Sequence, residues 1–201
     1  MPNPRVGVPY DHFIHRCARH RILAAGLPDI ADHQVRKLLA ELVMMRLFDD
    51  LQELIQGVAV RLACGAPYLD GVAPVLRVAP FRSTTQALHA FENLNRNSRK
   101  FAKWSKPAFV GDSIKHVLGP NEYLYGACVA ASAQLEEMRV VRNKIAHAAV
   151  SDFRDVVRRY YGAHLNNVTP GHLLLSPRRS PNLLTTYIQT CEVIARSICR
   201  A

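Results

Sequence analysis

The sequence predicts an all-α fold, a helical bundle of about five to six helices, on the basis of three observations. Apolar residues recur at helical spacing over several long stretches, Gly and Pro lie mainly between these stretches, and the segment at about 58–80 has the texture of irregular chain. We therefore expect a single domain over residues 1–201 with an irregular insertion at about 58–80.

Two helices are expected before this insertion. Residues 10–25 have apolar side chains at helical intervals, and the pattern stops at Gly26-Leu27-Pro28. Asp29 or Asp32 can cap a second helix, whose apolar positions continue to Gly57. Beyond Gly57, small and β-branched residues broken by Gly and Pro predict little regular structure, with at most one short strand.

The second half of the chain contains its longest apolar stripe. The stripe runs from 123 to 150 and predicts one central helix, with Ala127, Ala131, Leu135, Met138, Val141, Ile145 and Ala149 on its apolar side. Shorter helices are expected from Ser83 into the basic run near Trp104, at about 114–118, from 152 to 161 with Gly162 as the end, and from Leu183 to Cys199.

Composition limits the class of protein. Of the 201 residues, 49% are hydrophobic and 21% are charged, which is typical of a globular chain. No apolar run is long enough to span a bilayer, and residues 1–10 have no readable secretory signal, so we expect a cytoplasmic protein with no membrane partner. The five cysteines include no Cys-x-x-Cys pair, so we predict reduced core cysteines, no metal and no cofactor.

The formal net charge of +10 favours a polyanionic partner. Nucleic acid is the leading interpretation and an acidic protein the second, while a solvated basic surface is the alternative without a partner. Basic runs that contain aromatic residues resemble single-stranded nucleic-acid surfaces, although each alone is more often a solvated face. The residues predicted to contact RNA are Arg99, Lys100, Lys103, Arg139, Lys144, Arg158 and Arg159.

Arg142 is the anomalous residue of the central helix. At 100° per residue it falls within the apolar stripe, near Leu135 and Met138. A guanidinium in such surroundings needs a partner from another helix, another chain or a ligand. Within the chain, the second helix offers Asp49, Asp50 or Glu53, and outside it a phosphate would suit the planar fork of an arginine.

His147 and Asn143 complete a chemically sensible trio with Arg142. Asn143 lies one turn before His147 and can orient its imidazole by a hydrogen bond. A histidine can move a proton, an arginine can hold a phosphate, and an RNA supplies its own 2′-hydroxyl as nucleophile. The bare spacing is weak evidence, because it recurs from Arg159 to His164; the apolar setting of Arg142 distinguishes this case.

The segment from Val140 to Ala149 resembles the signature of HEPN domains, whose motif is an Arg followed after a short gap by a His. A polar residue very often follows that Arg, and Asn143 matches it. The resemblance covers the motif closely and the rest loosely, through an all-helical chain with the motif late in a long helix. Residues 168–177 are also similar to the RiboL-PSP-HEPN branch.

The resemblance implies a metal-independent endoribonuclease that works as a homodimer, with both motifs in one composite site. Arg142, Asn143 and His147 would be catalytic, the products would carry 2′,3′-cyclic phosphates, and the setting would be stress response or antiphage defence. A protein regulator or antitoxin is a further possible partner. HEPN toxins silenced by AMP transfer usually have a Tyr where this chain has Ala149, which argues against that mode. The alternative is a non-catalytic helical module that binds RNA or protein.

Overall fold

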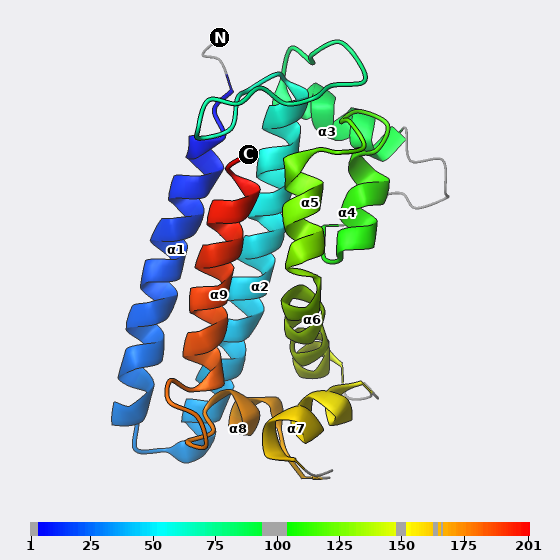
Figure 1. Cartoon of the computed structure of the whole chain (residues 1–201). Helices are drawn as coiled ribbons and strands as arrows, with labels where there is room; N and C mark the ends of the chain where they lie inside the picture. Colours follow the sequence, from blue (N-terminus) through cyan, green and yellow to red (C-terminus); the bar gives the residue numbers. More distant parts are fainter. Residues whose placement is uncertain (1–3, 94–103, 148–151, 163–164, 166) are drawn as a thin grey trace. The chain divides into compact units, whose positions relative to one another are not determined.

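The computed structural model describes residues 4–93, 104–147, 152–162, 165 and 167–201 (Figure 1). The predicted all-α class is confirmed, because 69% of the described residues are helical and they form no strand. One isolated antiparallel bridge pairs Leu76 with Leu118. The chain divides into two compact units, each built from separated segments: unit 1 comprises residues 1–14, 51–133 and 193–201, and unit 2 comprises residues 15–50 and 134–192.

The described helices outnumber the predicted ones. In chain order they are α1 (Gly7–Gly26), the 3₁₀ helix η1 (Leu27–Asp29), α2 (His33–Ala63), α3 (Thr84–Asn93), α4 (Pro107–Ile114), α5 (Tyr123–Ala130), α6 (Ser132–Ala146), α7 (Phe153–Tyr161), α8 (Pro170–Leu174) and α9 (Leu183–Ile198). The single helix predicted over 123–150 was wrong. It is divided at Ala131, whose backbone leaves helical geometry at φ −91° and ψ 9°.

Three other boundaries differ from the prediction. α2 continues through Gly57 to Ala63, so the irregular segment begins later than residue 58. A single Gly in a helix is tolerated when its neighbours pack, and Val58 and Ala59 are fully buried. The short helix expected at 114–118 lies earlier, as α4, and α8 was not predicted.

The predicted helix ends are largely confirmed. The Asp32 carboxylate accepts from the backbone N–H groups of Gln34 at 2.8 Å and Val35 at 3.1 Å, which caps α2. The Ser83 hydroxyl accepts from Gln86 at the start of α3. Gly162 ends α7 in the left-handed conformation at φ 70°, where an L side chain would be strained.

In unit 1, a buried glutamate anchors the connection between α2 and α3 to the start of α5. The Glu122 carboxylate is 1% exposed and accepts from the Tyr68 hydroxyl and, at 2.9 Å, from the Val75 N–H. The Tyr68 hydroxyl accepts in turn from Leu124 N–H at 3.1 Å. Burial, together with the bond to Glu122, raises the pKa of Tyr68 well above its ordinary value.

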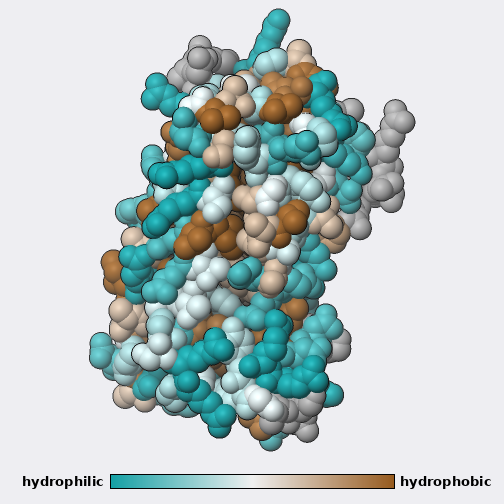
Figure 2. All heavy atoms as spheres, viewed as in Figure 1, coloured by the Kyte–Doolittle hydropathy of each residue, from teal (hydrophilic) through white to brown (hydrophobic). Residues whose placement is uncertain are grey.

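Hydrophobic side chains gather at the upper end of the view in Figure 2, over this same connection. Its exposed apolar residues are Leu69, Val72, Val75 and Val78. The segment was predicted to be irregular, with at most one short strand, and its bonds to Glu122 show how it is fixed in place.

In unit 2, the core is formed by the apolar faces of α6, α7 and α9 with parts of α1 and α2. Its fully buried members include Met44, Leu47, Met138, Val156 and Cys191. α8 approaches α2 closely, because a Cβ on Gly171 would lie 2.8 Å from the Lys37 carbonyl oxygen. The Gly171 N–H donates to the Glu41 carboxylate at 2.8 Å, which fixes this approach.

Asp50 joins α1 to α2 within unit 2. Its carboxylate accepts from Arg16 at 2.7 Å and lies 2.8 Å from His20 Nε2. Burial acts to raise the pKa of Asp50, but the hydrogen bonds with His20 and Arg16 hold it below the ordinary value of 3.8. This carboxylate therefore stabilises the folded state when it is ionised.

Asp50→Asn should lower the free energy of unfolding by about 1–2 kcal/mol at neutral pH, since Arg16 is partly solvent-screened. The contribution is complete above the unfolded pKa near 3.8 and is lost as pH falls through the lower folded pKa. Urea unfolding of both chains at pH 7 and at pH 3 measures it. The exposed Asp29 provides the control, and equal losses for Asp29→Asn and Asp50→Asn would contradict the assignment.

Candidate active site on helix α6

The predicted catalytic residues lie at the C-terminal end of α6. Arg142 and Asn143 are in its last turns, and His147 directly follows its last residue, Ala146. The backbone N–H of His147 donates to the carbonyl of Asn143 at 2.8 Å, which extends the helical bonding by one residue. His147 is exposed, so its imidazole is open to a ligand.

Arg142 is half-buried and incompletely partnered. Its side chain is 27% exposed, and its Nη2 lies 3.6 Å from Asp49 Oδ1 on α2, one of the three acids considered from the sequence. That distance is an ion pair and is too long for a hydrogen bond. The Nε atom is buried and has no hydrogen-bond partner among the described residues. Because Nε is closed to solvent, an anionic ligand would meet the exposed part of the guanidinium, which is 27% exposed as a side chain.

The predicted bond between Asn143 and His147 is absent. Both residues are described, and no side-chain hydrogen bond joins the Asn143 amide to the imidazole; the bond between them is the backbone one. His147 lies beyond the last helical residue, so the one-turn side-chain geometry of a continuing helix does not apply to it. In this structure Asn143 does not set the tautomer of His147.

Most of the predicted RNA-contacting cations that are described have carboxylate neighbours. Arg139 forms two hydrogen bonds with Glu136, at 2.9 and 2.5 Å, and these raise the pKa of Arg139. Arg158 lies 3.6 Å from Asp155, and Arg159 lies 3.1 Å from Glu137. Lys144 is half-buried on α6. Arg99, Lys100 and Lys103 lie outside the described residues.

The Glu137 carboxylate has three side-chain partners that the sequence did not predict. Its carboxylate accepts from the hydroxyls of Tyr160 at 2.6 Å and Tyr187 at 2.9 Å, and Arg159 completes the set. Burial first, and then the negative charge of Glu137, raise the pKa of both tyrosines. Glu137 thereby ties α7 and α9 to the helix that carries Arg142.

A cluster of arginines on tyrosine rings was also missed. Arg178 lies 4.8 Å from the ring centre of Tyr161, and Arg179 lies 4.4 Å from that of Tyr160. These distances are within cation–π range. We call these four residues the Arg–Tyr cluster. Each arginine is far from its tyrosine along the sequence, so no helical or strand periodicity links the two residues of a pair. The sequence shows only that the arginines are basic and the tyrosines aromatic.

Helix α7 has a buried apolar face and an exposed basic face. Phe153, Val156 and Val157 are buried, whereas Arg154 and Arg158 are exposed. The exposed Arg178 and Arg179 add to the basic side, beside the tyrosines at the end of α7. Unit 2 thus has a basic surface whose cations are held by aromatic rings rather than only by carboxylates.

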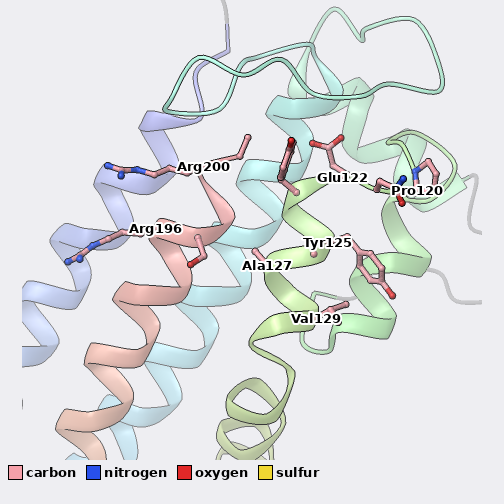
Figure 3. Close-up of a pocket in the computed structure, with 12 residues that line it drawn as sticks. Pro120, Glu122, Tyr125, Ala127, Val129, Arg196 and Arg200 are labelled. Carbon is pink, nitrogen blue, oxygen red and sulfur yellow. The ribbon is translucent and has the colours of Figure 1, made fainter.

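A cavity of about 680 Å³ lies in unit 1 between α5 and α9, and none of the predicted site residues that are described lines it (Figure 3). Gly126, Ala127 and Ser197 leave room for it. The side chains of Arg196 and Arg200 extend away from α5 in Figure 3, and the Glu122 carboxylate is occupied by Tyr68. The polar groups at this cavity do not converge on a common point, so it is not the candidate active site.

Within the described residues, no group of three His, Cys, Asp or Glu residues is placed to hold a metal ion. Among the described helices, none combines the length and apolar character needed to cross a membrane. Comparisons with known proteins gave no matching family model, no matching curated protein and no matching solved structure.

Proposed function

We propose that this protein is a metal-independent endoribonuclease of the HEPN type, with Arg142 and His147 as its catalytic residues. The observation that carries the proposal is the state of the motif at the end of α6. A half-buried guanidinium with an unsatisfied Nε lies five residues before an exposed imidazole. The pairing of a phosphate-binding cation with a proton-transfer group is the minimum that RNA cleavage requires.

The proposed reaction is internal transesterification of RNA. The 2′-oxygen forms a bond to the adjacent phosphorus, the bond from phosphorus to the 5′-oxygen breaks, and the products are a 2′,3′-cyclic phosphate and a free 5′-hydroxyl. His147 accepts the proton of the 2′-hydroxyl or donates one to the leaving 5′-oxygen. Arg142 holds the phosphate oxygens as negative charge builds on them.

A homodimer with a composite site is part of the proposal. In a dimer with both α6 ends together, one copy's histidine can act as base while the other acts as acid, which a single imidazole cannot do in one step. Stress response or antiphage defence in the cytoplasm, with a protein regulator or antitoxin, is the biological setting that we propose for such an enzyme.

The Arg–Tyr cluster supports RNA as the ligand. Single-stranded RNA is recognised by stacking on aromatic rings and guanidinium planes, with cations along the phosphates. Arg178 and Arg179 present exposed guanidiniums that are already stacked on one side. We propose that these two residues join Arg158 and Arg159 in binding the substrate.

The second candidate is a non-catalytic helical module that binds RNA or an acidic protein. The observation that favours it is the Arg142–Asp49 ion pair, because it gives the arginine a partner within its own chain. In this alternative Arg142 is structural, and the basic surface of unit 2 provides the binding.

Incubation of the purified full chain with end-labelled RNA in EDTA separates the two candidates. The nuclease should yield shorter fragments with 2′,3′-cyclic phosphate ends, identified by mass spectrometry, whereas the binding module should yield only a shifted band in a native gel. Fragments that disappear on EDTA addition would contradict the metal-independent reaction.

A further inference from the structure

Six exposed hydrophobic residues of unit 2 lie at the end of the α1–α2 hairpin, whose helices are joined by η1 (Figure 1). Their exposed fractions range from 36% to 72%. We call them the hairpin patch: Ile22, Leu23, Val35, Leu38, Leu39 and Leu42. Single exposed apolar residues are ordinary, but a contiguous group of this kind marks an interaction surface.

The four members of the patch that belong to α2 form one face of that helix. Leu38, Leu39 and Leu42 follow Val35 at three, four and seven residues, which places all four on the same side of the helix. The opposite side of this part of α2 is in the core, where Ala40, Met44 and Leu47 are fully buried. α2 is therefore apolar on two sides, and one of them has no cover in the described chain.

A hollow lies beside this face, between the end of α1 and α2. Its volume is about 450 Å³, and its lining is mostly apolar: Ile22, Leu23, Gly26, Leu27, Ile30, Leu39, Leu42 and Val43, with His20 and Arg46. A hollow of this size beside a stripe of exposed leucines suits the anchor side chains of an amphipathic helix, which recur at three- and four-residue intervals.

The charges around the patch point to an acidic partner. No carboxylate is among the residues that line the hollow, whereas Arg46 is. Arg46 and Arg19, which precedes Leu23 by one turn, are both exposed and form no ion pair in the described part of the chain. Their neighbour Arg21 differs, because it is paired with Glu192. These two cations can each meet a carboxylate on the rim of a partner.

A second copy of this chain fits the patch less well. An interface between two copies through this patch would bring two sets of Arg19 and Arg46 to one surface, where these cations repel each other. An acidic helix avoids this repulsion and gains attraction from both arginines.

We propose that the hairpin patch binds an amphipathic α-helix of a different protein, apolar on one face and acidic along its flanks. The helix inserts apolar side chains into the hollow, covers Leu38 and Leu42, and places carboxylates against Arg19 and Arg46. This binding is independent of the proposed nuclease, because neither Arg142 nor His147 takes part in it.

A pair of designed peptides tests the proposal with the full chain. Both have about 18 residues, with Leu at helical a and d spacing, and they differ in having Glu or Lys at all other positions. In fluorescence anisotropy, the Glu peptide should bind at least about tenfold more tightly than the Lys peptide, and added salt should reduce the difference.

Variants locate the surface. Leu38→Glu with Leu42→Glu should weaken binding of the Glu peptide at least about tenfold, and Arg46→Glu should reduce the preference for the Glu peptide over the Lys peptide. Val193→Glu is the matched control, because Val193 is an exposed apolar residue on α9 at 59% exposure. Far-UV circular dichroism checks that each variant keeps its helix content, as expected for substitutions at exposed positions.

Three outcomes would overturn the proposal. Equal binding of the two peptides would exclude an acidic partner. An equal loss of binding in the Val193→Glu control would show that the peptide does not bind at the hairpin patch. A chain that is dimeric by light scattering, and that becomes monomeric on Leu42→Glu, would assign the patch to a second copy. None of these measurements depends on RNA cleavage, so the fate of the nuclease proposal does not decide this one.

Discussion

Replacing His147 with alanine should reduce RNA cleavage by about 10²–10⁴-fold, the contribution typical of a positioned proton-transfer group. RNA binding should persist, because Arg142 and the Arg–Tyr cluster are unchanged. The fold should also persist, with unfolding free energy within about 0.5 kcal/mol of the parent chain, since His147 is exposed beyond the end of α6. Cleavage rates on a labelled RNA, binding by filter retention and urea unfolding measure the three quantities.

His172→Ala is the matched control for this experiment. His172 is also an exposed histidine of unit 2, in the short helix α8. Its loss should leave cleavage unchanged. Equal cleavage by the His147→Ala chain and the parent would remove the imidazole from the mechanism, and an equal loss in both variants would show that the assay responds to something other than the motif.

The fold class could be predicted because local patterns determine it. Ser83 and Gly162 were recognised as helix ends from their residue types alone, and each makes the expected cap or turn. Asp32 was one of two predicted caps of the second helix, with Asp29, and it is the one that makes the bonds. The break at Ala131 could not be predicted in this way. It lies in a segment of mostly small residues, from Gly126 to Ser132, that keeps helical spacing throughout, so tertiary packing decides where the helix is divided.

The residues of the candidate site could be predicted from the sequence, but the residues that their side chains contact could not. An arginine in an apolar stripe needs a partner. The sequence left another chain, a ligand or one of three acids of the second helix open as that partner, and the structure places Asp49 beside Arg142. The hydrogen bonds of Tyr160 and Tyr187 to Glu137 could not be predicted from the sequence, because the two tyrosines are far apart along the chain and in different helices. Such contacts depend on how helices pack, which residue periodicity does not encode.

Arg142→Lys distinguishes the nuclease from the binding module most sharply. Lysine keeps the charge that faces Asp49 but loses the planar fork that holds two phosphate oxygens. If Arg142 holds the scissile phosphate, cleavage should fall about 10²–10³-fold. Stability should change by less than about 1 kcal/mol, because the ion pair is 3.6 Å long and Asp49 is 43% exposed, so its carboxylate stays solvated without the arginine.

Asp49→Asn completes the comparison, because the two hypotheses assign opposite roles to the same contact. In the nuclease, Asp49 competes with the phosphate for Arg142, so Asp49→Asn should preserve cleavage and tighten RNA binding. In the binding module, the parent chain cleaves no RNA and the pair is structural, so Asp49→Asn should lower the unfolding free energy and neither variant should show cleavage. A double-mutant cycle on unfolding free energy, run beside the cleavage assay, measures the coupling of the pair. Coupling well above 1 kcal/mol, in a chain that cleaves no RNA, would establish Arg142 as a structural residue, since a partly exposed pair at 3.6 Å is otherwise expected to contribute less.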